Sequence, residues 1–104
     1  MDWKKVEGTG YMISDEGSVL KPNGKILRFR GTSYRRVPKL GFVHCLVAYH
    51  FLEHPISDKY GRWSFVGYEV HHKDRNPSNN RAGNLVYLTK EEHRKLHRVA
   101  VNLE

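Results

Sequence analysis

The chain has 104 residues, of which 38% are hydrophobic, so we expect one compact domain and exclude a disordered chain. No apolar run approaches the roughly 18 residues of a membrane span, no secretory signal peptide follows Met1, and the single cysteine, Cys45, suits a reducing cytoplasm. The formal net charge of +7 indicates a polyanionic partner, nucleic acid before an anionic membrane.

The first third of the chain predicts short antiparallel strands separated by glycine-containing turns. Apolar and β-branched residues alternate or cluster in short runs there, and each run ends at a turn signal. The predicted strands cover residues 11–14, 18–20, 25–30 and 34–39. The predicted turns lie at 15–17, 22–24 and 31–32, where Asn23-Gly24 favours a tight hairpin.

The rest of the chain predicts two helices around a pair of strands. A helix is expected over 43–52, because apolar residues recur at helical spacing and Pro55 prevents its continuation. Polar segments at 53–62 and 73–83 predict loops, and the strands are expected at 68–72 and 85–88. Thr89 with Glu92 three residues later forms a capping-box pattern, which predicts a helix from Lys90 to about Val101.

Four histidines stand out in this second part. His93 and His97 lie four residues apart on the predicted helix and therefore share a face, where two imidazoles can bind one divalent cation. Taken alone, this pair is equally well explained by a solvated basic helix face. His71 and His72 are neighbours on a strand, so their side chains point to opposite faces and only one can complete the site. The other is then available as a base beside an open metal site.

These residues resemble the HNH motif of the ββα-metal endonucleases. The matching segments are Val70-His71-His72, Asn84-Leu85 and Glu92–His97, with histidine spacing like that of the colicin nucleases. Residues 3–20 resemble a short module that precedes the nuclease in phage homing endonucleases, and 43–55 resemble the helix upstream of the motif in that branch. The resemblance covers nearly the whole chain and implies a phage or prophage source.

The resemblance implies a role for each motif residue. His72 would be the general base that deprotonates the attacking water, and Asn84 would hydrogen-bond across the loop between the strands and hold His72. His71, His93 and His97 would bind one divalent metal ion, Mg²⁺ or Mn²⁺ for activity, with Zn²⁺ or Ni²⁺ possible at imidazole ligands. The implied reaction is hydrolysis of a DNA phosphodiester bond, nicking one strand per active site.

Basic residues supply a second group of candidates. The segment from Lys21 to Leu40 holds seven Lys and Arg and no Asp or Glu. A solvated sheet face usually mixes charge signs, so this segment favours contact with a phosphate backbone. The candidate DNA-binding residues are Arg28, Arg30, Arg35, Arg36, Arg75, Arg81 and Arg94.

We therefore expect an α+β domain in which a small N-terminal antiparallel sheet and helix, residues 1–66, pack on a C-terminal ββα-metal motif, residues 67–104. The expected function is a metal-dependent endonuclease acting on double-stranded DNA as a monomer or homodimer. Two alternatives stay open: a non-catalytic DNA-binding module with a structural metal, and a nuclease acting on RNA. Four other residues are expected to be structural, namely His44, Cys45, His50 and His54.

Overall fold

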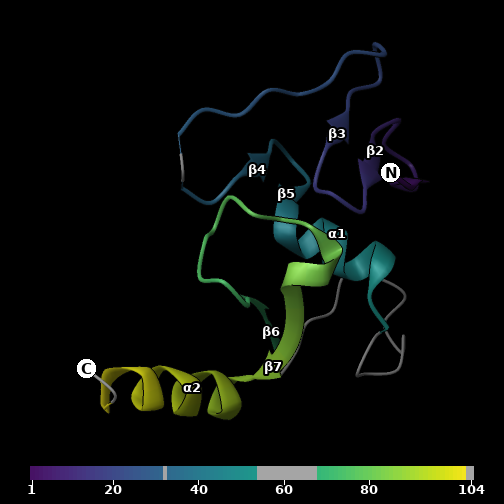
Figure 1. Cartoon of the computed structure of the whole chain (residues 1–104). Coiled ribbons are helices and arrows are strands. Elements are labelled where there is room, and N and C mark those ends of the chain that lie inside the picture. The colour runs from purple at the N-terminus through teal and green to yellow at the C-terminus, as the bar shows by residue number, and fades with distance from the viewer. Residues whose placement is uncertain (32, 54–67, 103–104) are drawn as a thin grey trace.

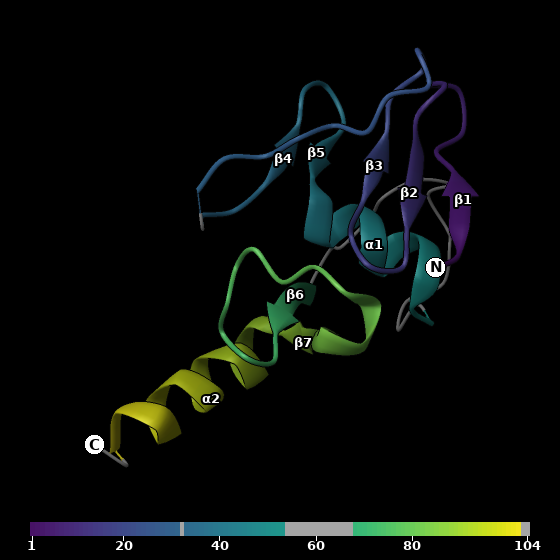
Figure 2. The ribbon, with the colours of Figure 1, turned by 45° about the horizontal axis from the view of Figure 1, so that its top comes forward.

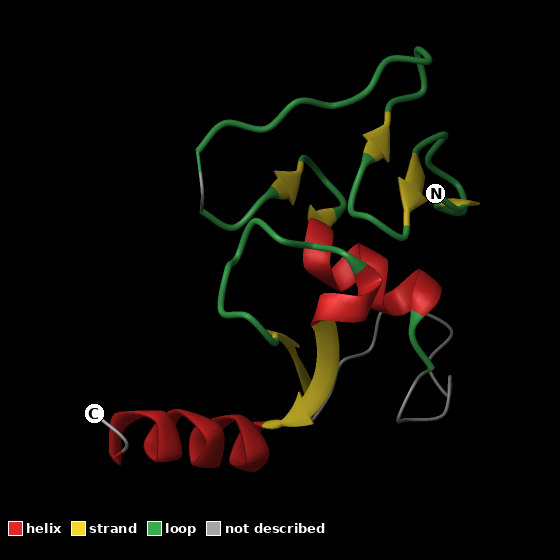
Figure 3. Cartoon of the chain, in the orientation of Figure 1, coloured by secondary structure: helices red, strands yellow, loops and turns green. Residues whose placement is uncertain are grey.

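A computed structural model describes residues 1–31, 33–53 and 68–102, with the side chains of 97–102 excepted. In this part of the chain, small antiparallel sheets and two α-helices form an α+β fold (Figures 1 and 3). The elements are β1 (Trp3–Lys5), β2 (Met12–Ser14), β3 (Val19–Leu20), β4 (Arg36–Val37), β5 (Gly41–Phe42), α1 (Val43–Phe51), β6 (Tyr68–His72), the 3₁₀ helix η1 (Ala82–Asn84), β7 (Leu85–Thr89) and α2 (Lys90–Asn102).

The N-terminal sheet has the order β1-β2-β3, so the predicted strands at 11–14 and 18–20 are confirmed, and β1 is an addition. The predicted strand at 25–30 is wrong. Only Ile26 forms a bridge, to Leu20, because β3 is two residues long and offers no ladder beyond that point. The alternating burial survives without a strand, since residues 27 and 29 pack against the core while 28 and 30 are exposed.

The strand predicted at 34–39 is much shorter in the structure. β4 covers only Arg36–Val37 and pairs with β5, a strand that was not predicted. Pro38 has no N–H to donate to a ladder, and Lys39 adopts a φ of 69° in the turn that leads to β5. The chain therefore reverses before the predicted strand is complete.

Helix α1 lies between the N-terminal strands and the β6–β7 hairpin (Figures 1 and 2). The predicted helix at 43–52 is confirmed, one residue shorter. Its apolar face joins both parts of the chain in one core, formed by Val6, Ile13, Val19, Val37, Val43, Leu46, Val47 and Leu85. Apart from Glu53, the loop predicted at 53–62 lies outside the described residues, as does His54.

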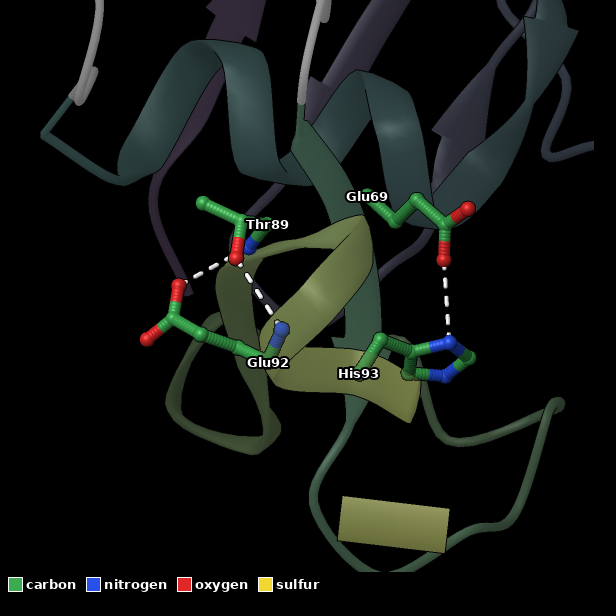
Figure 4. A network of polar contacts seen from close by, with 4 residues as sticks. All are labelled: Glu69, Thr89, Glu92 and His93. Carbon is green, nitrogen blue, oxygen red and sulfur yellow. Dashed lines mark hydrogen bonds and ion pairs between the residues drawn. The ribbon is translucent and has the colours of Figure 1, made fainter. Parts of the chain in front are cut away.

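The C-terminal part has the predicted order of strand, loop, strand and helix. β6 and β7 pair antiparallel over five residues each, with His72 opposite Leu85. At the start of α2, the backbone N–H of Glu92 donates to Thr89 Oγ1 at 3.0 Å, and that of Thr89 donates to Glu92 Oε1 at 2.9 Å (Figure 4). The predicted capping box is confirmed, and the hydrogen bond that the Glu92 carboxylate accepts from the Thr89 N–H is the largest cause that lowers the pKa of Glu92. No described helix is long and apolar enough to span a membrane.

Candidate functional site

A cleft of about 580 Å³ opens beside the β6–β7 hairpin, the start of α1 and the segment around β4 and β5. His71 and His72 reach it from β6, and His93 reaches it from the first turns of α2. The backbone of His97 lies in α2, but its side chain is outside the described residues. Three of the predicted motif histidines therefore meet in one place.

His71 and His93 face each other across the hairpin and the helix. Their ring centroids are 5.3 Å apart with the rings at 64°. His93 Nδ1 lies 2.9 Å from Glu69 Oε2, and a dashed line marks this contact in Figure 4. Glu69 precedes His71 by two residues on β6 and so projects from the same face of the strand. With Nδ1–H donating to the carboxylate, the lone pair of a neutral His93 ring is on Nε2.

His72 is held by a residue that the sequence did not single out. The side chain is 5% exposed, and its Nε2 lies 2.8 Å from Oδ1 of Asn80, which is itself 3% exposed. Because an amide oxygen only accepts, Nε2 of His72 carries the proton and donates. In the neutral ring, the lone pair is then on Nδ1.

Asn84 hydrogen-bonds across the loop as expected, but it does not hold His72 directly. Its Oδ1 accepts from the backbone N–H of Asp74, and its Nδ2 donates to Asp74 Oδ1 and to the carbonyl of Asn79. Its own carbonyl accepts from the N–H of Lys73, at 2.7 Å. In the described part of the chain, the side chain of His72 donates to Oδ1 of Asn80 instead. Asn84 therefore fixes the loop that begins at His72.

Asp74 organises the same loop. Its carboxylate accepts from the side chains of Asn79 and Asn84 and from the backbone N–H of Asn76. These hydrogen bonds, with that of Asn79 the largest contribution, lower the pKa of Asp74. The ionised carboxylate thus links three residues of the loop by hydrogen bonds.

The turn between β2 and β3 contacts the loop that joins β6 to η1. Gly17 has a φ of 85°, and a Cβ atom there would lie only 2.8 Å from Cβ of Asn80. The backbone N–H of Ala82 donates to the carbonyl of Asp15 at 2.7 Å. The N-terminal sheet therefore packs directly against the residue that holds His72.

His44, expected to be structural, lies against His72. The two ring centroids are 4.9 Å apart, and Nδ1 of His44 is buried with no hydrogen-bond partner among the described residues. Burial, with a smaller contribution from His72, lowers the pKa of His44 to about 4. Its neighbour Cys45 also lines the cleft, and burial raises the pKa of that thiol to about 11, so the thiol is protonated at neutral pH.

Comparisons with known proteins bear on the family and the fold of this chain. Residues 57–95 match the family model described as HNH endonuclease. The structure of the HNH homing endonuclease I-HmuI, reported for its DNA binding and cleavage, matches 100% of this chain with a TM-score of 0.70 and 28% sequence identity. By these two matches the chain is similar to the HNH endonucleases, a homing endonuclease among them. It covers 62% of the I-HmuI chain, and no curated protein matches it.

HNH nucleases generally use a divalent metal ion. Among the described side chains, no group of three His, Cys, Asp or Glu has a metal-binding arrangement. The facing imidazoles of His71 and His93 nevertheless form a donor pair that suits a divalent transition metal. Two protein ligands leave coordination positions for phosphate and water oxygens. The donor chemistry of these two residues is therefore compatible with one divalent ion.

The candidate DNA-binding arginines occupy different surroundings. Arg75 lines the cleft, whereas the guanidinium of Arg35 lies 5.4 Å from the ring centroid of Phe29 in a half-buried position. The others are exposed, namely Arg28, Arg30, Arg36, Arg81 and Arg94. Arg35 thus packs within the protein, while the other six are accessible.

Proposed function

We propose that this HNH protein is a metal-dependent endonuclease that hydrolyses phosphodiester bonds of double-stranded DNA and nicks one strand per active site. The observation that carries the proposal is one cleft that holds both an imidazole pair, His71 and His93, and a separately held histidine, His72. Ligands and base are thus different residues, as the chemistry requires. We retain His97 as a third ligand on the sequence motif alone.

In this mechanism, His72 takes the proton of the attacking water. The acceptor atom is Nδ1, because Nε2–H is engaged by Asn80 Oδ1. Asn80 fixes the direction of that lone pair, and Asn84 fixes the loop on which Asn80 lies. When bound, the metal ion stabilises the charge that develops on the phosphate and on the departing 3′ oxygen. His71 and His93 would hold that ion.

DNA is the proposed partner because the charges are complementary to it. The chain has a net charge of +7, and exposed arginines lie in the cleft, on the N-terminal segment and on α2. Binding through these residues should track the phosphate backbone and weaken steeply with salt. A monomer would nick duplex DNA, and a homodimer would place two sites on it. We propose a phage or prophage as its source.

The direct test is cleavage of supercoiled plasmid by the whole chain. With Mg²⁺ or Mn²⁺, we expect conversion to the open circle, and EDTA should abolish it until metal is restored. A gel-shift assay in EDTA measures DNA binding separately. If the folded protein binds DNA but cuts with none of Mg²⁺, Mn²⁺, Zn²⁺ or Ni²⁺, the chain is a DNA-binding module. Faster hydrolysis of RNA than of DNA would instead indicate a ribonuclease.

Glu69 should affect metal affinity without being a ligand. Glu69→Ala removes the carboxylate that orients His93, and loss of such a partner typically weakens metal binding by roughly 10- to 100-fold. Isothermal titration of the protein with Mn²⁺ or Zn²⁺ measures this. The matched control is Glu91→Ala, an exposed residue of α2 that pairs with Lys95 at 3.7 Å. Equal affinities of the two variants would contradict the role of Glu69.

A further inference from the structure

Two exposed aromatic rings lie side by side at the edge of the cleft. Tyr34 is 58% exposed and Phe42 is 42% exposed, and their ring centroids are 6.1 Å apart in an edge-to-face arrangement. Tyr34 precedes β4, and Phe42 ends β5. Single exposed apolar residues are common on protein surfaces, but neighbouring exposed aromatic rings are a feature of binding surfaces.

The Tyr34 ring of this pair lies next to His72, the candidate base. The centroid of Tyr34 is 5.9 Å from that of His72 and 5.6 Å from that of His44. All four rings line the same cleft. In both views of the ribbon, the β4–β5 hairpin faces the loop that follows β6 (Figures 1 and 2). A nucleobase that stacks on Tyr34 would therefore lie about one nucleotide away from the phosphate at which His72 acts.

The charges around the pair favour an anionic occupant. The guanidinium of Arg36 lies 5.9 Å from the ring centroid of Phe42, and Arg75 also lines the cleft. Among the described residues, Glu69 is the one carboxylate that lines the cleft, and it is paired with His93. Along a nucleic acid strand, bases alternate with phosphates. Aromatic rings can stack on the bases, and nearby arginines can bind the phosphates. An apolar protein partner would not account for the flanking arginines.

We propose that Tyr34 and Phe42 form an aromatic shelf, on which a nucleobase next to the cut phosphodiester stacks once it is unstacked from its neighbours in the duplex. The shelf would position the strand relative to His72, with the flanking arginines on its phosphates. Stacking tolerates any base, because every base has a π-face. The shelf therefore contributes affinity and register rather than sequence specificity. This inference rests on the proposed nuclease function.

The test uses the whole chain in EDTA with a DNA duplex that carries 2-aminopurine beside a nick position mapped in the plasmid assay. Wild-type protein should change the 2-aminopurine fluorescence on binding. Tyr34→Leu and Phe42→Leu should lose that change and weaken binding by roughly 5- to 100-fold each. Tyr34→Phe and Phe42→Tyr keep a ring and should behave as wild type. Ile26→Ala, at a 48% exposed residue that does not line the cleft, is the matched control.

The outcomes separate the shelf from the nuclease itself. If wild type nicks plasmid but the leucine variants keep wild-type affinity and fluorescence, the shelf is overturned and the nuclease stands. If wild type neither binds nor nicks DNA, both proposals are overturned. Circular dichroism of each variant verifies folding, and the ring-retaining variants show that an effect comes from stacking rather than from the substitution as such.

Discussion

His72→Ala should lower the rate of metal-dependent nicking by at least about 100-fold, because a positioned general base contributes that much or more to proton transfer. DNA affinity should change little, since the arginines proposed to contact phosphate, Arg75 excepted, lie outside the cleft. Single-turnover nicking at saturating protein measures the rate, and a gel shift in EDTA measures affinity. A loss of rate with retained affinity identifies a catalytic residue rather than a binding one.

The burial of His72 requires a second variant. Removing the ring leaves Asn80 Oδ1 without its donor in a site where both side chains are almost fully buried, which costs stability. His72→Gln keeps an N–H that can donate to Asn80 but cannot accept a proton at neutral pH. It should be as inactive as His72→Ala while folding better. His50→Ala, at a histidine of α1 that does not line the cleft, is the matched control.

Wild-type rates in His72→Gln would place the base on another residue. His44 would then be the first candidate, because its ring lies 4.9 Å from that of His72 in the same cleft. If wild type itself binds DNA without cutting and His72→Gln binds equally well, the chain is a DNA-binding module. The same two assays therefore distinguish a misassigned base from a protein that is not an enzyme.

The parts of the fold that the sequence predicted depend on interactions close along the chain. The capping box at Thr89 joins residues three apart, and the helices and the individual strands β6 and β7 follow from the local sequence pattern. The segment at 25–30 was misjudged because alternation shows which side chains face the core but not whether a partner strand is present. Strand pairing is a long-range property.

The difference between local and long-range interactions also applies to the site. The motif histidines could be found from the sequence, but most residues that contact them could not. His71, His72 and His93 could be picked out by spacing, although their chemical roles stay predictions. Glu69 had a local signal, since it shares a strand face with His71. Asn80 had none, because its contact with His72 depends on how the loop folds against the β2–β3 turn. His44 meets His72 only because α1 packs on the β6–β7 hairpin.

Gly17→Ala should impair cleavage although Gly17 touches neither DNA nor metal in the proposed mechanism. The new Cβ would lie 2.8 Å from Asn80 Cβ and 3.2 Å from its carbonyl oxygen, so Asn80 must shift. His72 would then lose the partner that aims its Nδ1. A displacement of about 1 Å at a catalytic group can cost on the order of 100-fold in rate. DNA affinity and metal affinity should stay close to those of wild type.

Gly24→Ala is the matched control, because it shares the backbone strain without the contact. Gly24 has a φ of 83°, close to the 85° of Gly17, but nothing lies within 4 Å of an added Cβ. Both substitutions should lower the free energy of unfolding by about 1 to 2 kcal/mol through the left-handed backbone. Only Gly17→Ala should slow nicking. Urea unfolding and single-turnover rates separate the two effects.

A double-mutant cycle tests whether Gly17 acts through Asn80. Asn80→Ala removes the amide that accepts from His72 and should itself slow nicking. If Gly17→Ala works by displacing that amide, adding it to Asn80→Ala should cause little further loss of rate, and the coupling should be large. Additive losses would mean that the β2–β3 turn influences the site by another route. Equal rates for Gly17→Ala and Gly24→Ala would show that the N-terminal sheet only stabilises the fold and does not position His72.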